Sequence, residues 1–205
     1  MILGILFVLL SRENYTQNTR LFCIVDSITK FVSRDDFASL DISDSEKTDS
    51  IFCYALKVSG NESDALLGLT IALVPHNKIP LTVPIIGYKI DVPFLSSAEE
   101  YFDKKNKNLP KRLFLDGPKN QYGDQDKLAH FFGSAFLSYN LRVLDYSLLI
   151  GYFVESFEET FGISRIDMRD MRANALGAEF GKLIRTKKIM PSQMFLIYNL
   201  KYFIL

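Results

Sequence analysis

Helical periodicity over residues 126–184 constrains the fold of this chain more than any other feature. Apolar, polar and small residues recur there three and four positions apart, which places each kind on one face of a helix. Breaks near residues 141–145 and 161–166 divide the segment into three predicted helices. Because short connections make successive helices antiparallel, the first and third helices should begin where the second ends. The sequence therefore predicts a three-helix module over residues 121–186.

Each predicted helix carries polar side chains at the end where the bundle should close. These residues are Asp126 and His130 in the first helix, Glu155 in the second, and Asp170 and Asn174 in the third. Glycines follow on the same faces, at positions 133, 151, 177 and 181. Small residues let helix axes approach closely, although glycine costs about 1 kcal/mol relative to alanine in a helix interior. We therefore expect a polar cluster at one end of a tightly packed bundle.

The three helical segments also carry a family resemblance. The stretches DKLAHFFGSAFLS, IGYFVESFEETFG and DMRANALGAEFG, within residues 122–184, resemble the YfiM-like family of envelope lipoproteins of unknown function. They are more distantly similar to the VanZ-like family of bacterial membrane proteins. The resemblance implies a location in the bacterial cell envelope, on the periplasmic side or at the membrane, and it implies no known reaction. The family-like polar positions are Asp126, Lys127, His130, Glu155, Asp170 and Asn174.

Residues 51–95 are rich in β-forming side chains. The runs IFCYALKVS, ALLGLTIALV and LTVPIIGYKIDVPF are separated by GNESD and PHNKIP, which have turn chemistry. This pattern predicts three or four strands in an antiparallel meander, after an acidic surface loop over residues 35–50. A short helix from Ser97 and a basic connector should follow. The predicted fold class is α+β, with a small, mostly antiparallel β-rich half over residues 11–120.

Both ends of the chain are apolar. Residues 1–10 form a run of signal-peptide length without a preceding Lys or Arg, which fits an incomplete export signal or anchor, or a buried first strand. The tail over residues 187–205 predicts either a last strand or an end that contacts a membrane. Cys23 and Cys53 fit a single disulfide or two buried thiols, and their spacing does not decide between these alternatives.

The charge composition excludes a global attraction to nucleic acid. Lys plus Arg and Asp plus Glu each number 24, so the formal net charge is zero. The sequence also has no nucleophile elbow, phosphate-binding loop or complete metal motif. The first functional hypothesis is therefore a non-enzymatic, membrane-associated envelope protein that contacts a membrane surface or another envelope component. Its polar cluster would hold the bundle together or bind an anionic headgroup.

The alternative hypothesis is a metal-dependent hydrolase that acts on an envelope lipid or phosphoester. A carboxylate beside an imidazole fixes its tautomer, which suits His130 as a ligand or general base, with Asp126 and Glu155 as the other candidate catalytic residues. Oxygen ligands beside one imidazole suit one divalent metal, such as zinc, manganese or iron. The predicted metal ligands are His130, Glu155 and Asp170, and the predicted anion-binding residues are Lys127, Arg165, Arg172 and Asn174. A histidine satisfied by an aspartate inside a packed bundle fits the same residues. The sequence indicates no oligomeric state.

Overall fold

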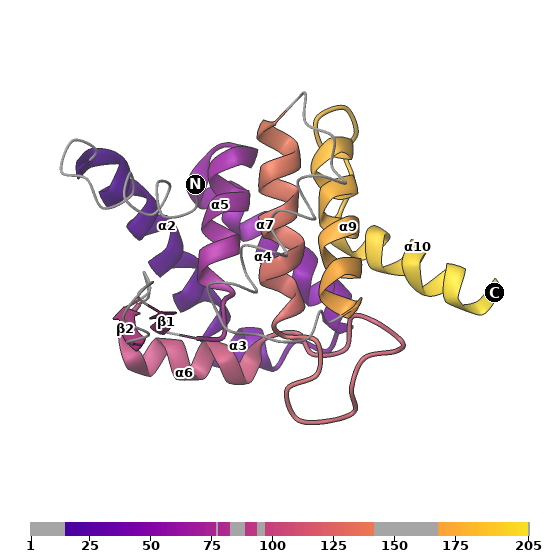
Figure 1. Cartoon of the computed structure of the whole chain (residues 1–205), viewed down its shortest axis with the longest axis horizontal. Coiled ribbons are helices and arrows are strands. Elements are labelled where there is room, and N and C mark those ends of the chain that lie inside the picture. The colour runs from indigo at the N-terminus through magenta and orange to yellow at the C-terminus, as the bar shows by residue number, and fades with distance from the viewer. Residues whose placement is uncertain (1–14, 77, 83–88, 94–96, 142–167, 205) are drawn as a thin grey trace.

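The computed structural model describes residues 15–76, 78–82, 89–93, 97–141 and 168–204. Within these ranges the chain is predominantly helical (Figure 1). In chain order, the elements are α2 (Tyr15–Val32), α3 (Asp35–Ala38), α4 (Asp44–Ser59), α5 (Glu62–Ala72), β1 (Lys78–Thr82), β2 (Lys89–Pro93), α6 (Glu99–Asn108), α7 (Lys127–Asn140), α9 (Met168–Leu183) and α10 (Pro191–Ile204).

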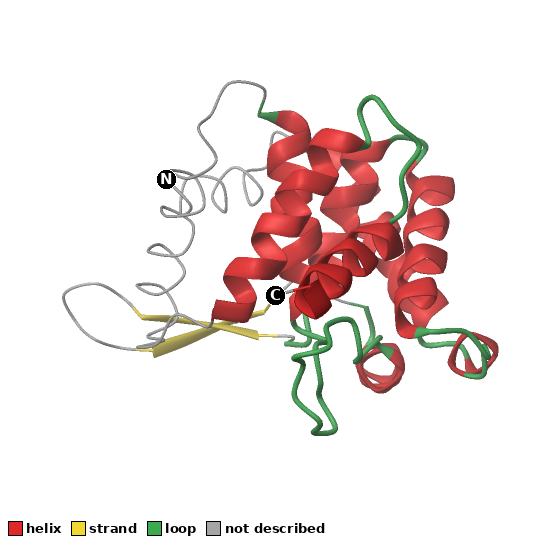
Figure 2. Ribbon diagram, turned by 90° about the vertical axis from the view of Figure 1, so that its right-hand side faces the viewer, coloured by secondary structure: helices red, strands yellow, loops and turns green. Residues whose placement is uncertain are grey.

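The prediction of a β-rich half over residues 11–120 is wrong, and with it the α+β fold class. Residues 51–59 and 65–72, which were expected to form strands, lie in α4 and α5, and the acidic residues 35–50 contain α3 and the start of α4. Of the predicted meander, the described residues contain one antiparallel pair, in which Lys78 of β1 is opposite Pro93 of β2. Figure 2 shows this pair at the edge of the helical body.

Local capping signals explain why these residues are helical. At the start of α4, the Ser43 hydroxyl accepts the Glu46 N–H at 3.3 Å, and the Glu46 carboxylate accepts the Ser43 N–H at 2.8 Å. Asn61 caps α5, because its side-chain oxygen accepts the Asp64 N–H at 2.8 Å. Both helices therefore begin at a satisfied cap, which holds the β-forming residues that follow in a helical backbone.

Phenylalanine rings link four helices in the core. The Phe131 ring on α7 has its centroid 5.3 Å from that of Phe180 on α9 and 5.0 Å from that of Phe195 on α10. Phe52 on α4 lies 5.3 Å from Phe180 and 6.2 Å from Phe132, again between ring centroids. Aromatic pairs at these separations contribute about 0.5–1.5 kcal/mol each beyond the burial of their area. The core is therefore continuous from α4 through α7 and α9 to α10.

Helices α7 and α9 lie side by side and approach each other very closely (Figure 1). At Gly177 and Gly181 of α9, a Cβ atom would overlap the backbone carbonyl oxygens of Phe131 and Ala135 of α7. Gly177 lies against Phe131, and Gly181, four residues later, lies against Ala135, also four residues later. The two helices are therefore parallel, as expected for the first and third helices of the predicted module. The predicted close packing at these two glycines is confirmed.

The remaining predictions for the C-terminal half have mixed outcomes. Gly133 of α7 faces α5, where an added Cβ would lie 3.2 Å from the methyl carbon of Thr70. Gly151 and the predicted second helix lie outside the described residues. The tail forms helix α10, so its assignment as a last strand is wrong. None of the helices in the described ranges combines the length and the hydrophobicity needed to cross a membrane.

A buried lysine satisfies the C-terminal end of α5. Lys105 of α6 donates from Nζ to the carbonyl oxygens of Val74 at 2.7 Å and Ala72 at 3.1 Å. Carbonyl groups at a helix end lack partners within the helix, so these hydrogen bonds replace the ones that the helix cannot supply. Burial lowers the pKa of Lys105 from 10.5 to about 7. A neutral amine still has two hydrogens for the two carbonyl groups, so either protonation state fits the site.

The lowered pKa of Lys105 predicts that stability rises with pH. The folded protein releases this proton near pH 7, whereas the unfolded chain keeps it up to a pKa of 10.5. Above pH 7 the unfolded state therefore binds more protons, and this group should raise the free energy of unfolding by about 1 kcal/mol between pH 7 and 8. Urea unfolding of the wild type and of Lys105→Met measures this effect. The wild type should gain stability relative to the variant as pH rises, and a constant difference would contradict the assignment.

Candidate functional site

The N-terminal ends of α7 and α9 bring predicted polar residues together. The Lys127 ammonium donates to the Asp126 carboxylate at 2.7 Å and also to the Asp170 carboxylate. Lys127 is fully buried, while both carboxylates are partly exposed. Burial opposes its positive charge, but the hydrogen bonds to Asp126 and Asp170 raise the pKa of Lys127 above its ordinary value. A charged lysine therefore holds the starts of the two helices together.

His130 lies beside Asp170, one turn farther along α7 than Lys127. Its Nε2 atom is 3.5 Å from Oδ1 of Asp170, which also accepts the hydrogen bond from Lys127. The structure thus places Asp126, His130 and Asp170 in one cluster, although the catalytic and metal-binding roles assigned to them stay predictions. Glu155 and Arg165, which were predicted to converge on the same place, lie outside the described residues.

Asn174 and Arg172, the other predicted site residues on α9, make contacts within the protein. The Ser134 hydroxyl of α7 donates to Oδ1 of Asn174 at 2.9 Å, which joins the two helices at a second point. The Arg172 guanidinium pairs with the carboxylate of Asp116, in the loop before α7. In this arrangement both side chains fix the position of α9. Their predicted roles in binding an anion or substrate stay predictions.

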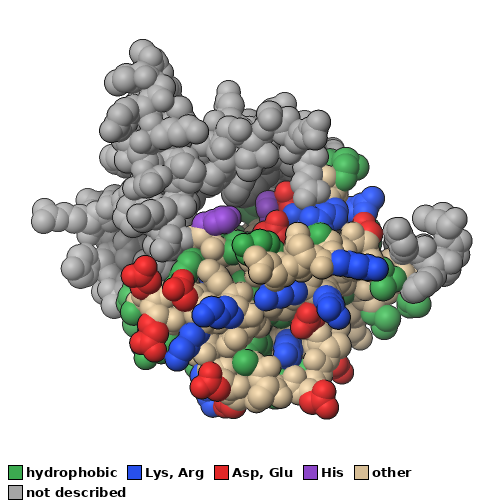
Figure 3. Space-filling model, turned by 90° about the horizontal axis from the view of Figure 1, so that it is seen from below, with side chains coloured by type: hydrophobic (Ala, Val, Ile, Leu, Met, Phe, Trp, Pro, Cys, Tyr) green, Lys and Arg blue, Asp and Glu red, His purple; other side chains and the backbone are tan. Residues whose placement is uncertain are grey.

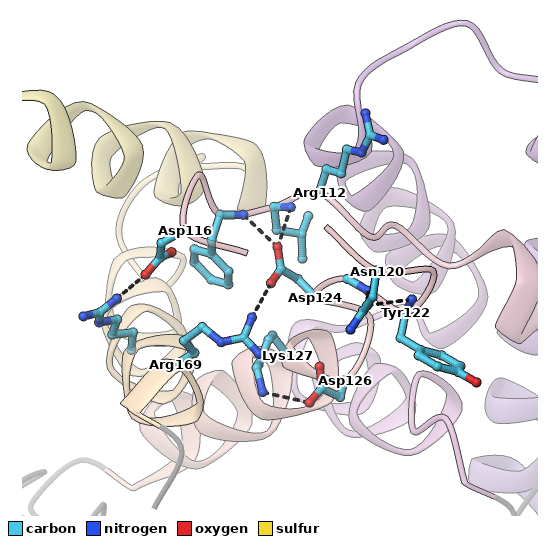
Figure 4. A network of polar contacts seen from close by, with 12 residues as sticks. Arg112, Asp116, Asn120, Tyr122, Asp124, Asp126, Lys127 and Arg169 are labelled. Carbon is cyan, nitrogen blue, oxygen red and sulfur yellow. Dashed lines mark hydrogen bonds and ion pairs between the residues drawn. The ribbon is translucent and has the colours of Figure 1, made fainter. Parts of the chain in front are cut away.

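Asp124 is the most deeply buried carboxylate near the cluster, and sequence reasoning missed it. Its side chain has no exposed surface, and it accepts the backbone N–H groups of Leu113 and Phe114, each at 3.1 Å (Figure 4). Arg169 of α9 donates to its other oxygen at 3.2 Å. Burial raises the pKa of Asp124, while the two backbone hydrogen bonds and Arg169 act in the opposite direction. Asp124 thus anchors the loop before α7 to the start of α9.

The loop over residues 109–126 folds around this carboxylate. The Asp124 N–H donates to the Lys111 carbonyl oxygen at 2.8 Å, and the Gly123 N–H donates to Oδ1 of Asn120, also at 2.8 Å. Gly123 has a φ of +55°, in the left-handed region, and an added Cβ would overlap the Lys111 carbonyl oxygen. The sequence offers a weak signal for this turn, because YGD places two turn-forming residues directly before the helical run.

The structure tests the predicted metal site only in part. The described residues contain no group of three His, Cys, Asp or Glu side chains that could hold a metal ion. Of the predicted ligands, His130 and Asp170 lie close together, and Glu155 falls outside the described ranges. The open question about the cysteines is answered, since Cys23 and Cys53 are both exposed and are not bridged.

A separate apolar surface lies on α10. Asp49 of α4 fixes the start of this helix, because its carboxylate accepts the Ser192 N–H at 2.8 Å and the Ser192 hydroxyl at 2.5 Å. Met194 and Phe195 are buried in the core. Large apolar side chains of α10 and of the neighbouring loop are exposed, and we call them the α10 patch: Leu196 (58% exposed), Leu200 (51%), Ile197 (44%) and Leu115 (51%).

Comparison with known protein families, with curated proteins and with solved structures finds no match to this chain. The resemblance to the YfiM-like and VanZ-like families therefore stays a prediction. The location in the bacterial cell envelope, which the resemblance implies, also stays a prediction.

Asp124 and Asp126 lie two positions apart and differ in burial, so a comparison of their alanine variants tests the role of Asp124. Asp124→Ala should lower the free energy of unfolding by about 3 kcal/mol, because Arg169 loses its hydrogen bond to this carboxylate and two buried N–H groups lose their acceptor. Asp126→Ala is the matched control, since its carboxylate is 45% exposed and Lys127 keeps Asp170 as a partner. We expect a loss of about 1 kcal/mol or less there. Urea unfolding compares the two, and equal losses would contradict the anchoring role.

Proposed function

We propose that this chain is a non-enzymatic protein of the bacterial cell envelope that lies on a membrane surface through the α10 patch. The observation that carries the proposal is the exposure of four large apolar side chains on α10 and on the loop that contacts it. Single exposed apolar residues are common on soluble proteins, but groups of them mark contact sites. Helices that lie in a membrane interface present such a group to the boundary between headgroups and acyl chains.

The inner side of α10 supports this proposal, because it holds the patch in a fixed position. Phe195 packs against the rings of Phe131 at 5.0 Å and Phe114 at 5.5 Å between centroids. Asp49 fixes the start of the helix through Ser192. A surface that is already ordered loses little conformational entropy when it binds. The α10 patch can therefore contact a membrane without refolding of the helix.

The size of the α10 patch fits reversible attachment. Full burial of a Leu or Ile side chain contributes about 1.5–3 kcal/mol, and about half of each patch side chain remains to be buried. Each residue then contributes about 1 kcal/mol, and the patch about 4 kcal/mol in total. Stable membrane attachment generally takes two separate signals. The α10 patch alone would therefore give weak binding, and a second attraction would strengthen it.

In this proposal the polar cluster is structural. Lys127 binds two carboxylates, and Asp124 binds Arg169 and two backbone N–H groups. These contacts join α7, α9 and the loop before α7, and they engage the groups that a catalytic site would use on a substrate. The arrangement therefore supports a role for the cluster in holding the fold together.

The hydrolase hypothesis is the second candidate, and one observation favours it. Nε2 of His130 lies 3.5 Å from Oδ1 of Asp170, within reach of a shared ligand. A metal bound there would compete with the Lys127 ammonium for Asp170. The metal would have to displace an ion pair that the buried ammonium already forms with Asp170, and this competition lowers the affinity for the metal. The hydrolase hypothesis therefore ranks below the membrane-surface proposal.

Vesicle binding tests the role of the α10 patch. The full chain should float with phospholipid vesicles in a density gradient. The double variant Leu196→Ser/Leu200→Ser should bind about 30-fold more weakly, because it loses about 2 kcal/mol of apolar contact. The matched control is Leu40→Ser/Ile42→Ser, since both side chains are 39% exposed and lie near α3. The proposal fails if the wild type binds no vesicle, or if the control weakens binding as much as the patch variant.

Metal content separates the two candidate functions. Protein purified without a metal-affinity tag should contain far less than one equivalent of metal by mass spectrometry, because Lys127 already binds Asp170, one of the predicted ligands. His130→Ala should give the same result as the wild type. Near-stoichiometric metal in the wild type that disappears in His130→Ala would support the hydrolase instead.

A further inference from the structure

We propose that a basic segment beside the α10 patch binds the phosphate groups of anionic lipids, so that the protein selects anionic membranes. This inference rests on the proposed function, in which the α10 patch contacts the membrane, and it supplies the second attraction that the patch requires. The basic segment lies at the end of α6 and in the loop before α7. It consists of Lys107, Lys111, Arg112 and Lys119.

Positive charge is concentrated in this part of a chain that has no net charge. Residues 104–119 contain six Lys or Arg residues and one acidic residue, Asp116. Asp116 already pairs with Arg172 of α9, and Lys105 is buried against the end of α5. The surface charge of the segment is therefore strongly positive.

The four cations of the basic segment form no ion pair with a residue in the described part of the chain, whereas nearby lysines do. Lys104 pairs with Glu100 at 3.3 Å, and Lys30 of α2 pairs with Asp26 at 2.8 Å. Cations without a carboxylate partner create a positive potential, which attracts anions such as phosphate groups.

The backbone of the basic segment is held in place by the rest of the fold. The Asp44 carboxylate at the start of α4 accepts the N–H groups of Lys111 at 2.9 Å and Arg112 at 2.8 Å. The Asn108 amide donates to the Val32 carbonyl oxygen at 2.9 Å, which joins the end of α6 to the end of α2. Even with the negative charge of Asp44 beside it, the basic segment keeps an excess of positive charge.

The basic segment and the α10 patch are neighbours. Asn199 of α10 donates to the Leu113 carbonyl oxygen at 3.0 Å and accepts the Leu115 N–H at 3.2 Å. Leu113 directly follows Arg112, and Leu115 belongs to the patch. Figure 3 shows the face that contains Lys and Arg side chains, with hydrophobic side chains at the edge where α10 lies. The charged and the apolar surface are therefore joined through Asn199.

A membrane interface matches this combination of surfaces. Apolar side chains enter the boundary between headgroups and acyl chains, and adjacent cations then lie at the level of the lipid phosphates. A nucleic acid would match the cations and leave the apolar side chains in water. Each Lys or Arg near an anionic membrane surface raises affinity about fivefold at physiological salt. Two such residues should therefore account for about a 30-fold difference in binding.

The test measures binding of the full chain to vesicles of two compositions. One is pure phosphatidylcholine, and the other contains about one-third phosphatidylglycerol, which adds anionic charge without a new kind of acyl chain. The wild type should bind the anionic vesicles at least 30-fold more tightly, and this preference should fall as salt is raised. Lys107→Gln/Arg112→Gln should lose about 30-fold in binding to anionic vesicles and should bind phosphatidylcholine as the wild type does.

The matched control is Lys30→Gln/Lys57→Gln, which removes two exposed lysines on α2 and α4. It should keep the anionic preference to within about twofold of the wild type. Equal binding of the wild type to both vesicles, or an equal loss in the control, would overturn the inference and leave the membrane-surface proposal standing. Absence of binding to every vesicle would overturn both. Binding of a short DNA duplex as tightly as anionic vesicles would assign the basic segment to nucleic acid and overturn the inference alone.

Discussion

The close parallel contact between α7 and α9 is the constraint on which the rest of the described structure depends. Gly177 and Gly181 set the helix spacing, because the absence of side chains leaves room for two carbonyl groups of α7. This spacing brings the starts of the two helices side by side, so that Lys127 reaches Asp170. A wider spacing would take Asp170 out of reach of the buried ammonium and break the ion pair that joins the two helices. Helix packing and the polar cluster therefore stabilise each other.

From this helix pair, a series of contacts leads to the surface. Arg169 at the start of α9 pairs with Asp124, which in turn fixes the backbone of Phe114 in the loop. The Phe114 ring packs edge-on against Phe195 at 5.5 Å and Tyr198 at 5.3 Å, measured between ring centroids. The buried carboxylate thus determines where α10 lies against the loop. It also fixes the backbone next to the basic segment, because Asp124 accepts the N–H of Leu113, which directly follows Arg112.

The sequence predicts correctly which residues share one face of a helix. It does not show which residues are buried, and the predictions that depend on burial fail. The meeting of His130 with Asp170 and the close approach of the helices at Gly177 and Gly181 could be expected, because positions three and four apart share a face. The run ALLGLTIA in α5 is apolar on every side, so it shows no helical period and resembles a buried strand. The Asn61 cap, whose side-chain oxygen accepts the Asp64 N–H, is the local signal that favours helix there. Asp124 could not be singled out, since a buried loop aspartate looks the same in sequence as an exposed one.

Charged groups of the polar cluster pair with each other, whereas those of the basic segment form no ion pair with the described residues. This difference separates the structural part of the chain from the part that we propose to bind a membrane. In the polar cluster, cations and carboxylates contact each other, and their interaction contributes to folding. The α10 patch and the basic segment reach the surface of the described structure, where Lys111 is half-buried and the other members are exposed, so contact with a partner can still lower their free energy. Because Asn199 joins the two surfaces, binding of one raises the effective concentration of the other at the membrane. Their adjacency, more than the strength of either surface, is what favours an anionic membrane as the partner.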